Sequence, residues 1–327
     1  MNFARGKKMI RNKKPKTPSA ILTGDWHLRE DTPVCRTDDF WAAQWDKVDQ
    51  IKQLQRKYDC SVYHSGDLFN HWKPSPYLLN ITMQKLPANF RTIYGNHDLP
   101  QHNIALSKKC GIDVLKRAKR VEVLDQCHWG DTPGVPSLIW YGEKTEAELR
   151  IENEYHPEFE YFPNENDHHI LIWHVMTYQG KSPWPGCTDL TAEEILLKYL
   201  EFDLIITGHN HKSFTESFTA DGKPHLLVNP GSLTRQAADQ ADHRPCVYLW
   251  YADTNTVKPY YLEINKGVVS REHLDRITAR DERIEAFVQR LSGEMEIGVN
   301  FEESLERFAQ KNKVRKSVME IVWRAVG

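Results

Sequence analysis

Apolar and polar residues alternate in blocks that predict strands and helices in turn over the first third of the chain. Short apolar runs with strand character are Ala20–Thr23, Cys60–His64 and Phe90–Tyr94. Between the first two, Phe40–Tyr58 carries apolar residues at three- and four-residue steps, the period of an amphipathic helix. A second helix is expected near Tyr77–Lys85. This alternation predicts a parallel or mixed sheet covered by helices.

The middle of the chain continues the pattern. Helices are expected over Ile104–Ala118, with a break at Gly111, and over Leu190–Leu200, which opens with a capping signal. The further expected strands are Val121–Leu124, Leu138–Tyr141, His169–Trp173, Phe202–Thr207, Phe214–Thr219, His225–Val228, Val247–Tyr251 and Val257–Leu262. Turn residues join the last two pairs, which predicts hairpins that add antiparallel strands at a sheet edge. The acidic, poorly periodic stretch Glu143–Asp167 predicts a surface excursion with a short helix near Glu146–Glu152.

The two ends of the chain differ from the middle. Residues 1–19 hold seven Lys and Arg and no acidic residue, so they are expected to form a basic disordered tail. Apolar residues at helical spacing over Asp281–Ser292, Phe301–Gln310 and Val314–Val326 predict a small helical module. The expected division is therefore a tail over 1–19, an α/β domain over 20–266 and a helical module over 267–327.

Composition excludes several classes of protein. The net charge of −2 over 327 residues does not announce a nucleic-acid or membrane partner, so any basic surface must be local. No apolar run approaches the ~18 residues of a membrane span, and no signal-peptide core follows Met1. The six cysteines form no C-x-x-C motif, and we expect reduced thiols in a cytoplasmic protein.

Side chains with metal-ligating chemistry follow five of the expected strands. These side chains are Asp25 with His27; Asp67; Asn96 with His97 and Asp98; His174; and His209 with His211. Because the carboxyl ends of strands share one edge of an α/β sheet, we expect these groups to converge. Leaving His97 and Asp98 aside, the groups suffice for two cations if one carboxylate bridges them. Paired cations ~3.5–4 Å apart clamp a phosphoryl group during in-line displacement.

Each of these residues alone has a simpler explanation. An aspartate such as Asp25 or Asp67 after a glycine is typical of a turn. His174 could be a core histidine held by hydrogen bonds, while His209 and His211 could face solvent. Five independent polar interruptions, each at the end of an expected strand, favour the shared metal site over separate local causes.

Five short motifs occur along the chain in the order GDWH, GDLF, GNHD, WH and GHNH. Over roughly residues 20 to 265 the chain thereby resembles the calcineurin-like metallophosphoesterases. The stretch GDLFNHWKPSP, with the NPGS turn before Arg235, makes it most similar to DNA nuclease subunits of the SbcD and meiotic-recombination type. The arginine that protein phosphatases carry soon after the second Gly-Asp is absent. The resemblance implies an α/β fold, a four-layer α/β/β/α sandwich followed by the small helical module.

The resemblance also implies roles for the motif residues. One cation would be held by Asp25, His27, Asp67 and His211, and the other by Asp67, Asn96, His174 and His209, with Asp67 bridging. His97 would protonate the leaving oxygen and Asp98 would orient His97. Mixed imidazole and carboxylate ligation fits Mn²⁺, Fe or Zn better than Mg²⁺ or Ca²⁺, and the family's habit points to Mn²⁺. A metal-bridging hydroxide would then attack phosphorus in line.

Four more residues are candidates for substrate binding, namely Asn70, His71, Trp72 and Arg235. Nucleases of the family often carry a histidine where this chain has Asn70, which makes the following His71 a candidate substitute. Trp72 has two interpretations: it stacks on a nucleobase, which is worth ~1–3 kcal/mol, or it packs in the core. The same two interpretations apply to Trp184.

The predicted function is that of a Mn²⁺-dependent DNA exo- or endonuclease in repair, recombination or replication. Two alternatives are a phosphodiesterase or pyrophosphatase for small nucleotides, and a non-catalytic scaffold of the same fold, which the full ligand set disfavours. In the family, a helical segment past the core docks on the coiled coil of an SMC-like ATPase of the SbcC type. Phe301–Val326 is the candidate for that docking, and packing of these helices against the core is the alternative. A homodimer is also compatible with the resemblance; a membrane partner is not expected.

Overall fold

A computed structural model of the chain describes residues 17–124, 127–130, 138–142, 168–220, 222–294 and 301–326. The basic tail before residue 17 and the acidic stretch with its expected short helix near Glu146–Glu152 lie outside these residues. The chain divides into two compact units between Val269 and Ser270, where the expected boundary lay at 266/267. Each unit is described by itself.

The first sheet of the larger unit has six strands, mixed in direction. Its order is β12-β11-β1-β2-β3-β4. The strands span Thr256–Tyr261, Cys246–Tyr251, Ala20–Thr23, Ser61–His64, Phe90–Thr92 and Glu122–Val123 respectively. Strands β1 to β4 are parallel to one another, while β11 runs antiparallel to both β1 and β12. The parallel strands put their carboxyl ends at one edge.

The second sheet also has six strands, in the order β5-β6-β7-β8-β10-β9. These strands span Cys127–Gly130, Leu138–Gly142, His168–Trp173, Leu204–Thr207, Lys223–Asn229 and Phe214–Ala220 respectively. Strands β6, β7, β8 and β10 are parallel, and β5 and β9 are antiparallel edges. Both expected hairpins form, β9–β10 at the edge of this sheet and β11–β12 at the edge of the first, whereas β5 was not predicted from the sequence.

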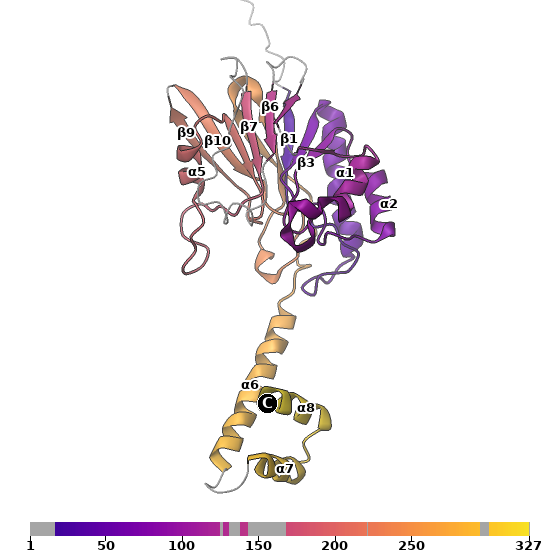
Figure 1. The fold of residues 1–327 in the computed structure, drawn as a ribbon, viewed down its shortest axis with the longest axis vertical. Coiled ribbons are helices and arrows are strands. Elements are labelled where there is room, and N and C mark those ends of the chain that lie inside the picture. Colours follow the sequence, from indigo (N-terminus) through magenta and orange to yellow (C-terminus); the bar gives the residue numbers. More distant parts are fainter. Residues whose placement is uncertain are drawn as a thin grey trace, which may run out of the picture. The chain divides into compact units, whose positions relative to one another are not determined.

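Helices cover the outer face of each sheet, as Figure 1 shows for α1, α2 and α5. The helices of this unit are α1 (Phe40–Tyr58), α2 (Pro76–Lys85), α3 (Gly111–Arg117) and α5 (Ala192–Lys198). Strand residues alternate between the layers: Ile21 belongs to the cluster under α1 and α2, and Leu22 to the cluster between the sheets. On β7, Leu171 faces the α5 side and Ile172 the other sheet. The fold is thus the expected α/β/β/α sandwich.

Local sequence signals explain where the helices begin and end. Asp39 accepts a hydrogen bond from the Ala42 amide at the start of α1, and Thr191 with Glu194 forms a reciprocal capping box on α5. The helix expected over residues 104–118 is instead a 3-10 helix, Ile104–Lys109, followed by α3. The break falls at the expected glycine, Gly111. A Cβ at this position would lie only 2.5 Å from Pro74, so only glycine fits there.

The segment that leaves β12 is held against the rest of the larger unit by hydrogen bonds to the carbonyls of Asn265 and Val268. The Arg235 guanidinium donates to the carbonyl of Asn265, and the Thr37 amide donates to the carbonyl of Val268 at 3.0 Å. Arg36 in turn donates to the carbonyl of Arg235 at 3.0 Å. The chain therefore leaves this unit from a fixed point.

The smaller unit consists of α6 (Glu272–Glu294), α7 (Phe301–Lys311) and α8 (Lys316–Val326). Its core centres on Leu305 and Val322, against which four partly buried residues pack: Phe287, Phe308, Met319 and Trp323. The first helix starts nine residues before the expected Asp281, because its early turns are polar and carry little apolar periodicity. Within the described residues, no helix is long and apolar enough to cross a membrane.

Candidate metal centre

The turns after β1, β2 and β8 carry their ligand side chains on an unusual backbone. Asp25, His27, Asp67 and His209 all have positive φ, between 45° and 76°. Such conformations are costly for residues other than glycine and persist only where the surroundings enforce them. Here the Asp25 amide donates to the Gly66 carbonyl at 3.1 Å and the His27 amide to the Asp67 carbonyl at 2.9 Å. The two turns thus brace each other and aim their side chains into one space.

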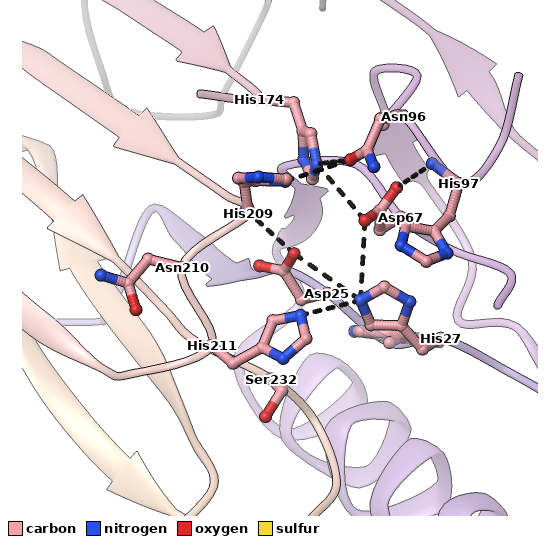
Figure 2. Close-up of polar contacts among 12 residues, drawn as sticks. Asp25, His27, Asp67, Asn96, His97, His174, His209, Asn210, His211 and Ser232 are labelled. Atoms are coloured by element: carbon pink, nitrogen blue, oxygen red, sulfur yellow. Dashed lines mark hydrogen bonds and ion pairs between the residues drawn. The ribbon is translucent and has the colours of Figure 1, made fainter. Parts of the chain in front are cut away.

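One group of ligand atoms joins the first sheet to the turn after β8. The Nε2 atoms of His27 and His211 are 3.0 Å apart. His27 Nε2 is also 4.0 Å from Asp25 Oδ1 and 3.6 Å from Asp67 Oδ2. Asp25, His27 and His211 each offer a ligand atom within 4.8 Å of the others. Figure 2 shows these side chains pointing toward one another.

A second group lies on the other side of Asp67. Asp67 Oδ2 is 3.3 Å from His174 Nε2. Asn96 Oδ1 is 2.9 Å from the same His174 nitrogen and 3.1 Å from His209 Nδ1. Asp67, His174 and His209 also have ligand atoms within 4.8 Å of one another. Since Asp67 Oδ2 lies near both groups, it occupies the position of a bridging carboxylate.

The two groups fit divalent cations. Asp25 Oδ2 is buried and has no hydrogen-bond partner among the described residues, a costly arrangement unless a cation satisfies it. The close approach of two imidazole nitrogens likewise favours a shared cation over a single hydrogen bond. Carboxylate, amide and imidazole donors together suit Mn²⁺, Fe and Zn. The structure thus brings together the ligands expected for both sites, which are Asp25, His27, Asp67, Asn96, His174, His209 and His211.

Burial and mutual charge shift the titration of these groups. Burial raises the pKa of Asp25 to about 7, an effect that His174 partly opposes. Burial also raises the pKa of Asp67, but the His174 and His27 imidazoles outweigh it and hold that pKa well below its usual range. Burial lowers the pKa of His27 and of His211. The histidines that face one another therefore stay neutral, the form that binds a cation.

Glycines allow the strand ends to approach closely. A Cβ on Gly208 would lie 2.5 Å from the Ser65 carbonyl oxygen and 2.7 Å from His174 Nδ1, and one on Gly95 would lie 2.1 Å from Asp67 Oδ1. No Cβ is tolerated at such distances. Both glycines therefore have a steric reason: Gly208 allows the two sheets to meet closely, and Gly95 allows the turns after β2 and β3 of the first sheet to do so.

His97 is exposed and lies beside the ligands, with its ring centroid 4.8 Å from that of His27. Its Nδ1 is 2.9 Å from the carbonyl oxygen of Asn70, so Nδ1 is the donor. The expected orientation of His97 by Asp98 is wrong. The Asp98 carboxylate is buried and instead accepts hydrogen bonds from three amides, those of Leu68, Phe69 and Gly95. Asp98 thus positions the 68–70 turn, whose Asn70 carbonyl holds His97.

The remaining predicted residues differ in position. Arg235 is only 5% exposed, and its guanidinium donates to the carbonyls of Ala241 and Asn265, so it is a structural residue, contrary to expectation. Trp72 packs partly buried against the core of the larger unit, as the packing interpretation predicted. His71 is exposed, and its Nδ1 accepts from the Lys73 amide. Asn70 contributes its backbone carbonyl to the site.

Several residues that position the ligands were not predicted. The Ser65 carbonyl accepts from His174 Nδ1 at 2.8 Å, which directs His174 Nε2 to the centre. Gln240 Nε2 lies 3.2 Å from His211 Nδ1. The Asn210 amide donates to the Thr177 carbonyl at 2.7 Å. Asn210 could have been suspected from its place between two ligands, but nothing in the local sequence marks Gln240.

Ligands of this kind, drawn from strand ends of two facing sheets, define the class of metal-dependent hydrolases of phosphoric esters. The chain belongs to the calcineurin-like phosphoesterase family, whose model matches residues 19–213. The matched range contains all seven expected ligands. The family membership confirms the resemblance at this level and makes the chain a metallophosphoesterase with a candidate site for two divalent ions.

Comparison with other proteins adds little to the family assignment. None of the curated proteins compared with the chain matches it. Among solved structures, the crystal structure of TT1561 of Thermus thermophilus is 10% identical; the alignment covers 76% of this chain and 100% of that one, with a TM-score of 0.42. GAP50, the anchor in the inner membrane complex of Plasmodium, is 13% identical over 81% of this chain and 95% of that one, with a TM-score of 0.41. At such TM-scores, neither structural similarity supports a conclusion about the function of this chain.

Proposed function

We propose that this metallophosphoesterase is a DNA nuclease of the SbcD and meiotic-recombination type. The observation that carries the catalytic part is the meeting of seven ligand groups around Asp67, with the exposed His97 beside them. The DNA part is supported by the GDLFNHWKPSP stretch and by the absence of the protein-phosphatase arginine. Mn²⁺ is the proposed cation, because the donor set mixes imidazole with carboxylate.

The residues of the site have two proposed roles, cation binding and proton transfer. Asp25, His27, Asp67 and His211 would hold one cation, and Asp67, Asn96, His174 and His209 the other. When bound, paired divalent cations supply Lewis acidity that activates water and offsets charge on the phosphoryl oxygens. Asp67 keeps its negative charge for both sites, because its pKa lies far below neutral pH.

His97 is the proposed general acid. The Asn70 carbonyl accepts from His97 Nδ1, which fixes the ring and leaves Nε2 as the nitrogen that gains and gives a proton. On the side of His97 facing His27, a phosphodiester would present its leaving oxygen. Proton donation from a positioned side chain contributes typically ~10²–10⁴-fold to the rate.

The smaller unit is a proposed docking site for an SMC-like ATPase. Its apolar residues exceed what its core uses: Ile277, Ile284 and Ile321 are 45%, 39% and 56% exposed. Exposed aliphatic residues at helical spacing suit a coiled-coil partner. Co-purification with a coiled-coil ATPase of the SbcC type would support this docking. A chain truncated near residue 267 that still bound the ATPase would refute it.

A nuclease assay with Mn²⁺ tests the proposed function. End-labelled duplex and hairpin DNA are incubated with the full-length protein, and a nitrophenyl phosphodiester serves as a small substrate. We expect cleavage of both DNA and the diester. Diester hydrolysis without any DNA cleavage would reject the nuclease and favour a phosphodiesterase for small nucleotides.

A further inference from the structure

A loop between β7 and α5 presents a tryptophan to solvent. Residues 179–186 are all exposed, and the Trp184 side chain within them is 47% exposed. Figure 1 draws this segment as a loop that extends from the sheet before α5. Trp26 and Trp250, by contrast, are fully buried. An indole offers one of the largest apolar surfaces of any side chain, so Trp184 presents a flat aromatic face that a ligand could cover.

The loop's own structure holds Trp184 outward. Pro183 and Pro185 flank it and fix the backbone φ on either side. Its carbonyl accepts two hydrogen bonds, from Ser182 Oγ at 2.7 Å and from the Cys187 amide at 3.3 Å. The indole is therefore carried on a preorganised turn, which reduces the entropy lost when a ligand binds.

The base of the loop is tied to the candidate metal centre. Tyr178 and Thr191 form a bridge that closes the loop, and Thr177 Oγ1 donates to the Leu190 carbonyl at 2.9 Å. The Thr177 carbonyl accepts from the side chain of Asn210, which lies between the ligands His209 and His211. Trp184 follows Tyr178 by six positions, so the Cα atoms of these two residues lie at most about 20 Å apart, a span of a few nucleotides.

We propose that Trp184 stacks on an unpaired nucleobase of the DNA strand whose phosphodiester enters the metal centre, with Lys181 beside it on the backbone phosphates. The proposal rests on the nuclease function above and narrows its substrate class to DNA with a single-stranded segment. A stacked base in a duplex has no free face, whereas every unpaired base offers one.

Steady-state kinetics of the full-length protein with Mn²⁺ test the proposal. The substrates are a duplex with a single-stranded overhang, a blunt duplex and a nitrophenyl phosphodiester. Trp184→Ala is expected to raise KM for the overhang DNA about 5- to 150-fold, the loss typical of one stacked base. The ratio of overhang to diester efficiency falls by the same factor. Trp184→Phe keeps a stacking face and restores KM to within about threefold.

A matched control separates stacking from general loss of an aromatic side chain. Phe218→Ala removes another exposed aromatic, 39% exposed on β9, and leaves overhang KM at the wild-type value. The proposal is overturned if KM for the overhang DNA is the same in the wild type and Trp184→Ala. It is also overturned if Trp184→Ala raises KM for the blunt duplex as much as it raises KM for the overhang DNA. If the wild type hydrolyses the diester but no DNA, the nuclease function fails first and the Trp184 proposal falls with it.

Discussion

The two sheets contribute different chemistry to the candidate metal centre. The first sheet supplies both carboxylates, Asp25 and Asp67, together with Asn96 and the exposed His97. The second sheet supplies only imidazoles, from His174, His209 and His211. One sheet thus brings the carboxylates and the proposed acid, while the other completes the coordination with imidazole nitrogens.

This division means that each of the two expected ligand sets draws on both sheets. The first group needs His211 to join Asp25 and His27, and the second needs His174 and His209 to join Asp67 and Asn96. A bound cation would therefore link the two sheets as well as perform chemistry. Stability and activity should respond together when the centre is disturbed, and separately when other residues are changed.

Removal of divalent cations should have the largest effect. Treatment with a chelator is expected to abolish diester hydrolysis, and added Mn²⁺ should restore it. Cations that bind only the folded state stabilise it, so their removal should also lower the free energy of unfolding. The loss is about 2.7 kcal/mol for a cation present at a hundredfold its Kd. Thermal unfolding with and without chelator measures this. Identical melting temperatures would show that cations do not link the sheets.

His97→Ala should reduce turnover at least about a hundredfold while the cation content stays unchanged. The reason is that His97 lies beside the ligands without being one of the seven. Turnover on the diester and metal analysis of the same sample provide the two readouts. His273→Ala is the control, because His273 lies on α6 of the smaller unit and is not part of the candidate metal centre; its turnover should remain within a few-fold of wild type. Unchanged turnover in His97→Ala would reject His97 as the acid.

Gly208→Ala should disturb the meeting of the sheets. The new methyl group would press on the Ser65 carbonyl and on His174, and overpacking of this kind costs about 1–3 kcal/mol. Gly222→Ala is the matched control. Nothing lies within 4 Å of a Cβ added at Gly222, but the φ of this residue is +75°. The substitution should therefore lower the free energy of unfolding by about 1–2 kcal/mol from backbone strain alone. Denaturant unfolding should register both, whereas diester hydrolysis should fall only in Gly208→Ala. Full activity in Gly208→Ala would show that the sheets can separate freely.

His64→Asn should flatten the acid limb of the stability curve, an effect on stability in the first sheet rather than on the cation ligands. Burial lowers the pKa of His64 to about 3. Between that value and 6.5 only the unfolded chain binds the proton, so stability falls as pH falls, by about 1.4 kcal/mol per unit. His64 Nδ1 faces Thr92 Oγ1 at 2.9 Å, and asparagine keeps an N–H there. Denaturant unfolding in chelator from pH 7 to 4 measures the difference; parallel curves for both proteins would contradict it.

Local patterns in the sequence were sufficient to predict an α/β fold and the meeting of the seven candidate ligands, and the family resemblance added the four-layer sandwich. Apolar runs such as Ala20–Thr23 become strands, and their carboxyl ends bring the motif residues together without any knowledge of loops. The match to residues 19–213 confirms the family. The DNA substrate and the ATPase partner stay predictions, since their recognition lies in surface residues that no motif fixes.

The failures concern contacts between residues distant in sequence. Proximity in sequence suggested that Asp98 serves His97, but the carboxylate turns toward the amides of the 68–70 segment. The position of Arg235 after a turn typical of the family suggested substrate binding, whereas its guanidinium donates to the carbonyls of residues 241 and 265. The left-handed backbone at Asp25 and Asp67 has no sequence signal either, because it is imposed by the neighbouring turn.

The anchored exit of the chain has a consequence for how the two units act together. Because Arg235 and Thr37 hold the carbonyls of residues 265 and 268, the connection to the smaller unit begins at a fixed point on the larger one. A molecule bound by the smaller unit is therefore tethered to the larger unit and has a raised effective concentration there. A longer connecting segment would lower that effective concentration.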